Sequence, residues 1–388
     1  MSDTNKMMTF VSEWLQEQYE PMRQLLQELV DIDSYSLNEL GRLAVAQRVI
    51  KQLTDAGIDA ALLTDHETYA VKACVGDPSA APVVLSGHMD TVFPTGEVLK
   101  RPYTEQDGKA MGPGVTDMKA GIVMNCFILQ AFHHYQMASG KTLPLQLMLL
   151  ATTDEEIGSP QGRHVIYQHV EGAKAVFNAE PGRISGNVVN ARKGGATYTF
   201  EVTGRAAHAG VSHQDGISAI GILADLIQKL HALTDYDAGI TTNVGVMSGG
   251  TTPNTVAQYA SAKLDVRYLT ATQGEWLEDQ ITQCVTAAQR ANSTIVWHKI
   301  AGFVPFEEPM SRSLLSLYKE EALALGFTVD GEFTGGCSDA GWTSSMGIPT
   351  LCATGPVGGY AHTEREFCDL TTFVPRALIV ARCCCAIG

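Results

Sequence analysis

Basic residues are scarce in this chain of 388 residues. It contains 27 lysines and arginines against 42 aspartates and glutamates, which gives a formal net charge of −15. A protein that binds nucleic acid usually presents a basic face to the phosphates, so this balance argues against that class. A chain with an acidic excess is better suited to stay in solution and to attract metal cations.

Long apolar runs and regularly spaced cysteines are missing as well. No stretch reaches the roughly 18 uncharged apolar residues that a membrane-spanning helix needs, and residues 1–20 lack the apolar core of a signal peptide. The nine cysteines include three in a row at positions 383–385, which is no pattern for a disulfide framework. We therefore expect a cytoplasmic protein without a membrane or nucleic-acid partner.

The first third of the chain has the pattern of an α/β domain. Apolar residues with helical spacing occur in residues 10–31, 37–56 and 119–137. Strand-like runs lie between and after them, at residues 60–63, 69–75, 82–86 and 145–152. Strands that alternate with helices in this way predict a mostly parallel sheet. The same pattern returns at the end of the chain, with a helix at 312–325, a strand at 350–353 and a helix at 373–386.

The middle of the chain has a different order. Residues 197–298 read strand, helix, strand, strand, helix, strand, which is the ferredoxin-like α+β order. This domain therefore interrupts the larger one. We expect the larger domain in two parts, residues 1–191 and 301–388, and the inserted domain at residues 192–300.

The end of one predicted strand carries two polar residues. The segment "SGHMDTV", residues 86–92, places His88 and Asp90 on the same side of an extended backbone. A metal-bound histidine usually donates its second ring N–H to such a carboxylate, so the pair suits a metal ligand and its orienting group. The alternative is a polar strand end with satisfied hydrogen bonds.

Acidic residues follow two further apolar segments. "GPGVTDMKAG" places Asp117 directly before a helix, where a carboxylate could also serve as an N-cap. "TTDEEIGS" follows the almost continuously apolar run at residues 145–152 with Asp154, Glu155 and Glu156, which could also form a solvated turn. Open α/β sheets place their sites at the carboxyl ends of strands, which favours a functional interpretation.

Two more stretches complete a set of possible metal ligands. "FNAEPG" ends a short apolar segment with Glu180, and "GGYAHTEREF" places His362 in a glycine-bounded loop. Taken together, His88 and Glu180 could hold one divalent cation and Glu156 and His362 another, with Asp117 between the two. Each cation would then have three protein ligands and an open position, as a catalytic zinc requires.

Eight motifs resemble those of the M20 family of metallopeptidases and occur in the same order: "SGHMDTV", "GPGVTDMKAG", "TTDEEIGS", "FNAEPG", "GRAAHAG", "GGTTPNTVAQYASAKLDVRY", "TGGCSDAG" and "GGYAHTEREF". The resemblance extends from about residue 25 to the C-terminus. Within the family, the motifs are most similar to those of glutamate carboxypeptidases, with similarity also to acetylornithine deacetylases and succinyl-diaminopimelate desuccinylases. The family fold, a catalytic α/β domain with an inserted lid or dimerisation domain, agrees with the predicted order of elements.

The resemblance implies two Zn²⁺ ions per subunit, or Co²⁺ or Mn²⁺ in their place. The implied ligands of one ion are His88, Asp117 and Glu180, and those of the other are Asp117, Glu156 and His362. Asp90 matches the carboxylate that orients the first histidine, and Glu155 matches the general base. A cis peptide between Asp117 and Met118 is also implied.

The inserted domain is expected to contribute to the site. His208 in "GRAAHAG" resembles the histidine that reaches the partner subunit's active site and stabilises the oxyanion, so we expect a homodimer. Asn254 and Arg267 resemble a polar pair that contacts the substrate. The loop "TGGCSDAG" is expected to line the pocket with backbone amides, among them those of Gly335 and Gly336.

The expected activity is hydrolysis of the amide bond of N-acyl amino acids or short peptides, with release of a C-terminal amino acid, glutamate being favoured. Val188 stands where the lysine of glutamate carboxypeptidases is expected, and Arg192 or Lys193 could substitute for it. An N-acyl-amino-acid deacylase or a dipeptidase is therefore the alternative. A non-catalytic metal-binding protein is the alternative from another class. Cys337 is expected to be a pocket-wall residue rather than a nucleophile.

Overall fold

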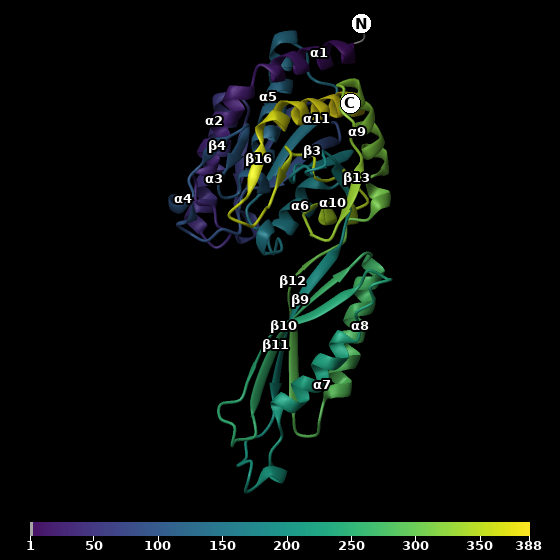
Figure 1. The fold of residues 1–388 in the computed structure, drawn as a ribbon. Helices are drawn as coiled ribbons and strands as arrows, with labels where there is room; N and C mark the ends of the chain where they lie inside the picture. The colour runs from purple at the N-terminus through teal and green to yellow at the C-terminus, as the bar shows by residue number, and fades with distance from the viewer. Residues whose placement is uncertain (1–2) are drawn as a thin grey trace. The chain divides into compact units, whose positions relative to one another are not determined.

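A computed structural model describes residues 3–388 of the chain (Figure 1). The chain divides into two compact units. Unit 1 contains the residues up to Ala191, Glu308–Phe333 and Ser338–Gly388, and unit 2 contains Arg192–Glu307 and Thr334–Cys337. The sequence-based boundary at residue 300 falls inside a strand that runs to Phe303, which is why unit 2 continues to Glu307.

Unit 1 is built on a six-stranded sheet in the order β1-β2-β6-β3-β7-β14. Its strands are β1 (Ala60–Leu63), β2 (Ala70–Gly76), β3 (Pro82–His88), β6 (Gln146–Thr152), β7 (Ala175–Asn178) and β14 (Thr350–Leu351). The four strands β6, β3, β7 and β14 run parallel, while β1 and β2 form an antiparallel edge. The predicted mostly parallel sheet is confirmed. β3 and β6 are buried at every position after the first, as expected of strands covered on both faces.

Unit 1 also contains nine α-helices among the described residues, several of which pack against this sheet. They are α1 (Asp3–Gln16), α2 (Tyr19–Val30), α3 (Glu39–Asp55), α4 (Glu97–Lys100), α5 (Ala120–Ser139), α6 (Gly162–Val170), α9 (Arg312–Ala324), α10 (Ala340–Ser345) and α11 (Phe373–Ile387). Pro21 lies in the first turn of α2, where a missing N–H is tolerated. α5 is buried all round over residues 120–132, so it is a core helix.

The C-terminal helix α11 belongs to the same core. By length and hydropathy alone, Leu370–Ile387 could cross a membrane, but 61% of this segment is buried inside the protein. α11 packs against α1, α5 and α9, so that the first and last helices of the chain lie side by side (Figure 1). The burial of α11 explains its apolar composition without a membrane.

Several short strands were not expected from the sequence. β15 (Gly358–Gly359), β16 (Phe367–Asp369), β5 (Lys109–Met111) and β4 (Thr104–Gln106) form a second sheet of unit 1 in that order, and β13 (Gly331–Thr334) pairs with β8 (Val188–Arg192). Segments of two to five residues are too short to show a period. The β15–β16 pair matters for function because His362 lies in the loop that connects the two strands.

Unit 2 has the predicted ferredoxin-like order. Its elements are β9 (Gly194–Thr203), α7 (Ala219–His231), β10 (Thr241–Gly249), β11 (Tyr259–Tyr268), α8 (Ala271–Ala288) and β12 (Thr294–Phe303), with an antiparallel sheet in the order β10-β11-β9-β12. Both helices lie on one face of the sheet (Figure 1). Alternate residues of β9, namely Tyr198, Phe200 and Val202, are buried beneath them. A capping box of Thr270 and Gln273 begins α8.

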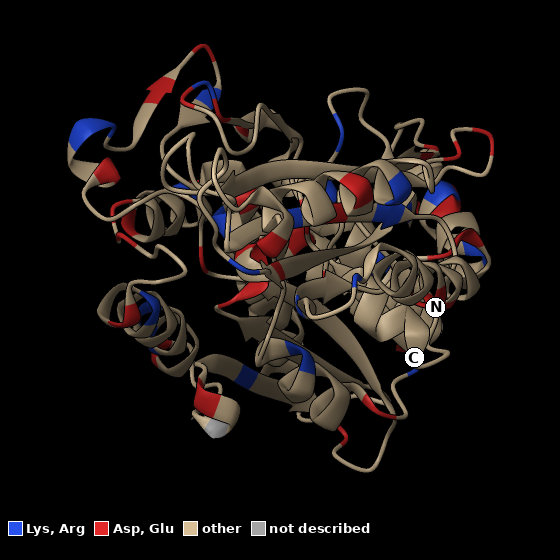
Figure 2. Ribbon diagram, turned by 90° about the horizontal axis from the view of Figure 1, so that it is seen from below, with Lys and Arg blue, Asp and Glu red and all other residues tan. Residues whose placement is uncertain are grey.

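Charged side chains are mixed along the helices and loops. Acidic and basic residues lie interspersed in the view of Figure 2. The buried acidic side chains among the described residues all belong to unit 1: Asp90, Asp154, Glu155, Glu180, Glu321, Asp339 and Glu366. Because burying a carboxylate is costly unless it is compensated, this group marks where a functional site should be sought.

Candidate metal centre

Neighbouring strands of the unit 1 sheet bring the predicted ligands together. His88 is the last residue of β3, Glu156 lies four residues after the end of β6, and Glu180 lies two residues after the end of β7. These three strands are adjacent and parallel, so their carboxyl ends meet at one edge of the sheet. Asp117, in the turn before α5, and His362, in the β15–β16 loop, complete the group.

The five side chains form two triplets that share Asp117. In the first, His88 Nε2 lies 3.2 Å from Asp117 Oδ1 and 3.8 Å from Glu180 Oε1. In the second, His362 Nε2 lies 3.2 Å from Asp117 Oδ2 and 3.1 Å from Glu156 Oε2. Within each triplet the possible ligand atoms all lie within 4.8 Å of one another. Asp117 thus offers one carboxylate oxygen to each histidine.

Asp90 fixes the ring of His88 from behind. It is fully buried, and its Oδ1 lies 3.4 Å from His88 Nδ1. Its carboxylate also accepts hydrogen bonds from Ser36 Oγ at 2.7 Å and from the N–H groups of Glu155 at 3.2 Å and Glu156 at 3.3 Å. A carboxylate at Nδ1 leaves Nε2 directed at Asp117, which is the orientation that a metal-ligating histidine needs. The sequence analysis did not identify Ser36.

Protonation is strongly perturbed in this cluster. Burial raises the pKa of Glu155 well above its usual range, and burial together with Asp117 raises the pKa of Glu156 to about 7. Hydrogen bonds with Asp117 and Glu156 raise the pKa of His362 to about 10. Burial opposes ionisation of Asp117, but hydrogen bonds from His362 and His88 lower its pKa below the usual range. Burial and the neighbouring charges therefore perturb the ionisation of every carboxyl group named here.

The donor set fits divalent cations. Carboxylates and imidazoles are ligands that Zn²⁺, Co²⁺ and Mn²⁺ accept. Glu156 Oε1 is buried and has no hydrogen-bond partner among the described residues, although its other oxygen faces His362. An unsatisfied buried carboxylate oxygen is costly unless an ion or a water reaches it. Three protein donors in each triplet would leave open positions for other ligands.

Glu155 lies beside the two triplets without belonging to either. It begins a short helical turn, Glu155–Ile157, and its Oε2 is 3.8 Å from His88 Nε2. The side chain is buried, and burial raises its pKa. A carboxyl group next to a metal cluster but outside its ligand set is placed to accept and donate a proton.

The turn that carries Asp117 is held by a residue that the sequence analysis missed. The peptide between Asp117 and Met118 is cis, as the resemblance implied. Glu366 is fully buried and accepts hydrogen bonds from the N–H groups of Thr116 at 2.9 Å, Asp117 at 3.1 Å and Gly114 at 3.4 Å. Burial and the charge of Asp117 raise the pKa of Glu366 to about 8. The sequence signal that could have identified Glu366 is its position in the motif "GGYAHTEREF", which also contains His362.

Two other buried acids support the chain around the cluster. Asp339 accepts hydrogen bonds from the hydroxyls of Ser159 and Thr152, and Asp154 accepts them from the N–H groups of Gln161 and Gly162. The second pair secures the start of α6. Asp154 therefore has a structural role, whereas its neighbours Glu155 and Glu156 face the cluster.

The candidate residues of unit 2 fall at two separate places. His208 is exposed and bridges to Thr255, and the N–H of Ala209 donates to the carbonyl oxygen of Asn254 at 3.0 Å, so His208 and Asn254 are close in space. Arg267 lies at the other end of β11. The nine residues from Tyr259 to Arg267 span about 27 Å of extended strand. Asn254 and Arg267 are therefore not neighbours within one chain, and their expected contacts with the substrate stay a prediction.

Arg267 is anchored beside the glycine loop. Its guanidinium forms a fork with Asp265, at 3.0 Å and 2.9 Å, and its Nη1 donates to Cys337 Sγ at 2.9 Å. In the same loop, which includes Gly335, the carbonyl oxygen of Gly336 accepts a hydrogen bond from Arg192 Nη1 at 3.2 Å. Burial raises the pKa of Cys337, so this thiol is a poor nucleophile.

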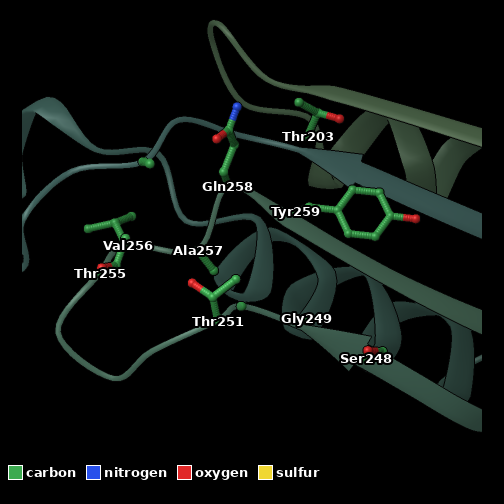
Figure 3. A pocket seen from close by; sticks show the side chains of 11 residues that line it. Thr203, Ser248, Gly249, Thr251, Thr255, Val256, Ala257, Gln258 and Tyr259 are labelled. Atoms are coloured by element: carbon green, nitrogen blue, oxygen red, sulfur yellow. The ribbon is translucent and has the colours of Figure 1, made fainter.

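Unit 2 also contains a pocket of about 400 Å³ near the loop that follows β10. Figure 3 shows Thr251, Thr255 and Gln258 among its lining side chains. Its lining includes no histidine, aspartate or glutamate. The pocket offers hydroxyl and amide contacts but neither metal ligands nor a carboxylate base, so the cluster of unit 1 remains the candidate site.

Comparison with known proteins agrees with this geometry. Residues 84–385 match the family described as Peptidase family M20/M25/M40. The chain belongs to this family. It is thus an M20 hydrolase, and members of this family are metal-dependent peptidases and amidohydrolases.

Two relatives in sequence carry different names. Carboxypeptidase G2 of Pseudomonas sp. (strain RS-16) is 28% identical over 312 residues, which cover 77% of this chain and 72% of that protein. Acetylornithine deacetylase of Buchnera aphidicola subsp. Schizaphis graminum is 25% identical over 331 residues, which cover 81% and 82%. Similarity to both leaves the acyl and amino acid specificity of this M20 hydrolase open.

Solved structures share its fold. A tripeptidase from Staphylococcus aureus superposes with a TM-score of 0.77 at 21% identity, covering 95% of this chain and 98% of that one. The M20 family metallo-carboxypeptidase Sso-CP2 from Sulfolobus solfataricus superposes with a TM-score of 0.75 at 18% identity, covering 94% and 99%. At these identities the likeness establishes the fold of the M20 hydrolase and not its substrate.

Proposed function

We propose that this M20 hydrolase is a two-metal carboxypeptidase or amidohydrolase. It cleaves the amide bond of N-acyl amino acids or short peptides and releases the C-terminal amino acid. The observation that carries the proposal is the pair of triplets that share Asp117, with one oxygen of this carboxylate facing each histidine. Such an arrangement suits two divalent cations with a common bridging ligand.

The ligands of one cation are His88, Asp117 and Glu180, and those of the other are Asp117, Glu156 and His362. We propose Zn²⁺ as the cation, with Co²⁺ or Mn²⁺ as possible replacements. When bound, such a pair polarises a carbonyl oxygen and acidifies water. Asp90 keeps the His88 ring in place through Nδ1, so that Nε2 stays available.

Glu155 is the proposed general base and acid. It lies next to the ligands, is buried, and has a pKa raised by burial, which makes it a better proton acceptor than an exposed glutamate. In the proposed reaction its carboxylate takes a proton from the attacking water. It then gives that proton to the amide nitrogen as the C–N bond breaks, so that the leaving amino acid departs as a neutral amine.

We further propose a homodimer in which His208 and Asn254 serve the site of the partner subunit. Within unit 2, His208 and Asn254 lie near the start of β11, whereas Arg267 and the glycine loop lie near its end, and the strand from Tyr259 to Arg267 is about 27 Å long. A substrate of one or two residues is too short to reach both groups of one chain. If both groups contact one substrate, two copies of the chain must supply them.

Substrate selection is proposed to rest on Arg267 and Arg192. Arg267 can fork onto the terminal carboxylate of the substrate. Val188 is fully buried, so it offers no contact to a substrate side chain. Lys193 Nζ donates to the carbonyl oxygen of Gly239 at 2.6 Å, whereas Arg192 lies at the glycine loop. Arg192 is therefore the better candidate to recognise a glutamate side chain.

The buried valine at position 188 also favours a second candidate function. Without the lysine expected of a glutamate carboxypeptidase, the same site could act as an N-acyl-amino-acid deacylase or a dipeptidase. The match to acetylornithine deacetylase is consistent with this alternative. Both candidates share the metal centre and Glu155, and they differ only in the groups on either side of the scissile bond.

A cytoplasmic location is part of the proposal. The nine cysteines are free thiols in the structure, and six of them are buried: Cys126, Cys352, Cys368, Cys383, Cys384 and Cys385. A protein that keeps all of its thiols reduced fits a reducing compartment. Fractionation of the source cells, followed by detection of the chain, tests this assignment.

The decisive test is release of free amino acid by zinc-loaded protein from a panel of N-acyl amino acids and dipeptides. Glu155→Gln serves as the catalytic blank and Glu364→Gln, an exposed glutamate, as the matched control. Cleavage confined to C-terminal glutamate or aspartate supports the carboxypeptidase. Cleavage with another preference supports the deacylase or dipeptidase. No turnover on any substrate with two metals bound would contradict the proposal and favour a non-catalytic metal-binding protein.

A further inference from the structure

A separate cavity of about 180 Å³ lies in unit 1 beside the C-terminal helix. Its walls are mostly apolar and include Phe327, Val329, Val357 and Ile379. Arg376, on α11, is also among the residues that line it. None of the predicted metal ligands contributes to the lining.

Arg376 places a buried positive charge in this wall. It is only 4% exposed, and its guanidinium donates to Tyr318 Oη at 2.9 Å and to the carbonyl oxygens of Gly186 at 2.6 Å and Asn187 at 3.3 Å. All three acceptors are neutral. These contacts use three of the five N–H donors of the guanidinium.

The neighbouring arginine on the same helix shows the usual arrangement. Arg382 forms an ion pair with Glu321 at 2.7 Å. Arg376 has no carboxylate within ion-pair distance among the described residues, although it is the more deeply buried of the two. Because a buried charge is normally paired, an anion in the cavity would supply the missing partner.

We propose that this cavity binds a small carboxylic acid with an apolar body, with its carboxylate on Arg376. The apolar walls suit an aryl or branched alkyl group, and the hydroxyls of Thr328 and Thr371 lie at the exposed rim. A dry cavity of about 150 Å³ is large enough for benzene, so the volume here suits an aromatic acid of the size of benzoate. Free amino acids are excluded, because their ammonium group would meet a cation and no carboxylate lines the cavity.

This site is independent of the proposed hydrolytic function. An N-acyl amino acid must reach the metal cluster to be cleaved, whereas the acid proposed here binds against α11. A carboxylate can also bind to a metal centre, so the test has to separate the two places.

Binding of benzoate to the zinc-loaded, full-length protein is measured by calorimetry, with benzyl alcohol as the neutral analogue. Four proteins are compared: wild type, Arg376→Gln, Thr328→Trp, which plugs the exposed rim, and Arg312→Gln, an exposed arginine paired with Glu308. We expect wild type and Arg312→Gln to bind benzoate alike and benzyl alcohol at least tenfold more weakly. Arg376→Gln should lose at least tenfold in affinity, and Thr328→Trp should lose binding.

Crystals soaked with 4-bromobenzoate locate the site through the anomalous signal of bromine. Bromine in the cavity beside Arg376 supports the proposal even if Arg376→Gln fails to fold. Bromine at the metal cluster alone, equal binding of benzoate and benzyl alcohol, or unchanged affinity in Thr328→Trp would overturn it. None of these readouts depends on hydrolysis, so their failure leaves the proposed enzymatic function untouched.

Discussion

The two units differ in the burial and the spacing of their candidate functional residues. In unit 1, His88 and Asp90 are buried, with exposed fractions of 1% and 0%, and they meet partners from distant segments of the chain. In unit 2, His208 and Asn254 are exposed on loops, and Arg267 lies at the far end of the same sheet. Unit 1 therefore gathers its candidate residues into one cluster, whereas the candidate residues of unit 2 lie apart from one another.

The difference follows from the two sheets. A parallel sheet gathers the carboxyl ends of its strands at one edge, so residues far apart in sequence converge there. An antiparallel sheet sends successive strand ends to opposite edges, so the groups of unit 2 are spread along it. The first sheet can therefore bring metal ligands together, whereas the second keeps its candidate residues apart.

Removal of the shared ligand, Asp117, is expected to have the largest effect. Asp117→Asn takes one carboxylate from both triplets, so we expect metal content to fall from two ions per chain to fewer than one and turnover to fall to background. Metal content is measured by inductively coupled plasma mass spectrometry after dialysis. Asp59→Asn, at an exposed position, is the control. Retention of two ions by Asp117→Asn would show that the triplets are not the metal sites.

The next largest effect is expected in unit 2. Loss of an oxyanion-stabilising side chain costs about 10²–10³ in kcat, so His208→Ala should show such a loss with unchanged metal content and melting temperature. His213→Ala removes another exposed histidine of the same unit and should leave kcat unchanged. Equal kcat values for the two variants would remove His208 from the site.

Mixed dimers test whether His208 of one chain serves the site of the other. His208→Ala and Glu155→Gln are both impaired, but a heterodimer of the two would contain one site with the intact Glu155 of one chain and the intact His208 of the other. Mixing them after subunit exchange should therefore restore activity to about a quarter of the wild-type value per site. No recovery with proven subunit exchange would contradict the contribution from the partner.

How far the sequence predicts this molecule also differs between elements. The strand at residues 60–63 and the order of unit 2 follow from apolar periodicity, and the ends of β3 and β6 pointed to His88 and Glu156. The short strand β16 is defined by pairing with residues near position 110, and β15 by pairing with β16, which no local pattern reveals. Residues that act through hydrogen bonds to remote segments cannot be identified from local sequence for the same reason. Ser36 and Glu366 are examples.

Substitution of Glu366 is expected to have a smaller effect on metal affinity. It tests whether hydrogen bonds from a remote segment support the turn that carries Asp117. In Glu366→Gln, an amide N–H₂ replaces one of the oxygens that accept the N–H groups of Gly114, Thr116 and Asp117. Loss of a residue that positions a metal ligand typically costs 10- to 100-fold in metal affinity, so we expect a decrease of about that size. Affinity is measured by competition with a chelator, and Glu364→Gln in the same loop is the control. Unchanged affinity in both variants would limit Glu366 to a role in folding.

The last prediction concerns thiol labelling, and the substitution-free protein should keep its turnover. Burial raises the pKa of Cys126, in the core helix α5 of unit 1, to about 12, whereas Cys284 on α8 of unit 2 is only partly buried. The thiolate is the reactive form, so at pH 8 alkylation of Cys126 should be about 1,000-fold slower than that of an ordinary thiol. Because the pKa is raised, the rate should increase about tenfold for each pH unit while the protein stays folded.

Iodoacetamide labelling at pH 7, 8 and 9, followed by peptide mass spectrometry, compares the two sites in one sample. We expect Cys284 to be labelled well before Cys126 at each pH, because α8 packs on one face only and α5 is enclosed. Denatured protein, in which both thiols are exposed, gives the reference rates. Equal labelling of the two cysteines in the folded protein would mean that the core of unit 1 opens as readily as the surface of unit 2. The contrast between the buried cluster of unit 1 and the exposed candidate residues of unit 2 would then not hold.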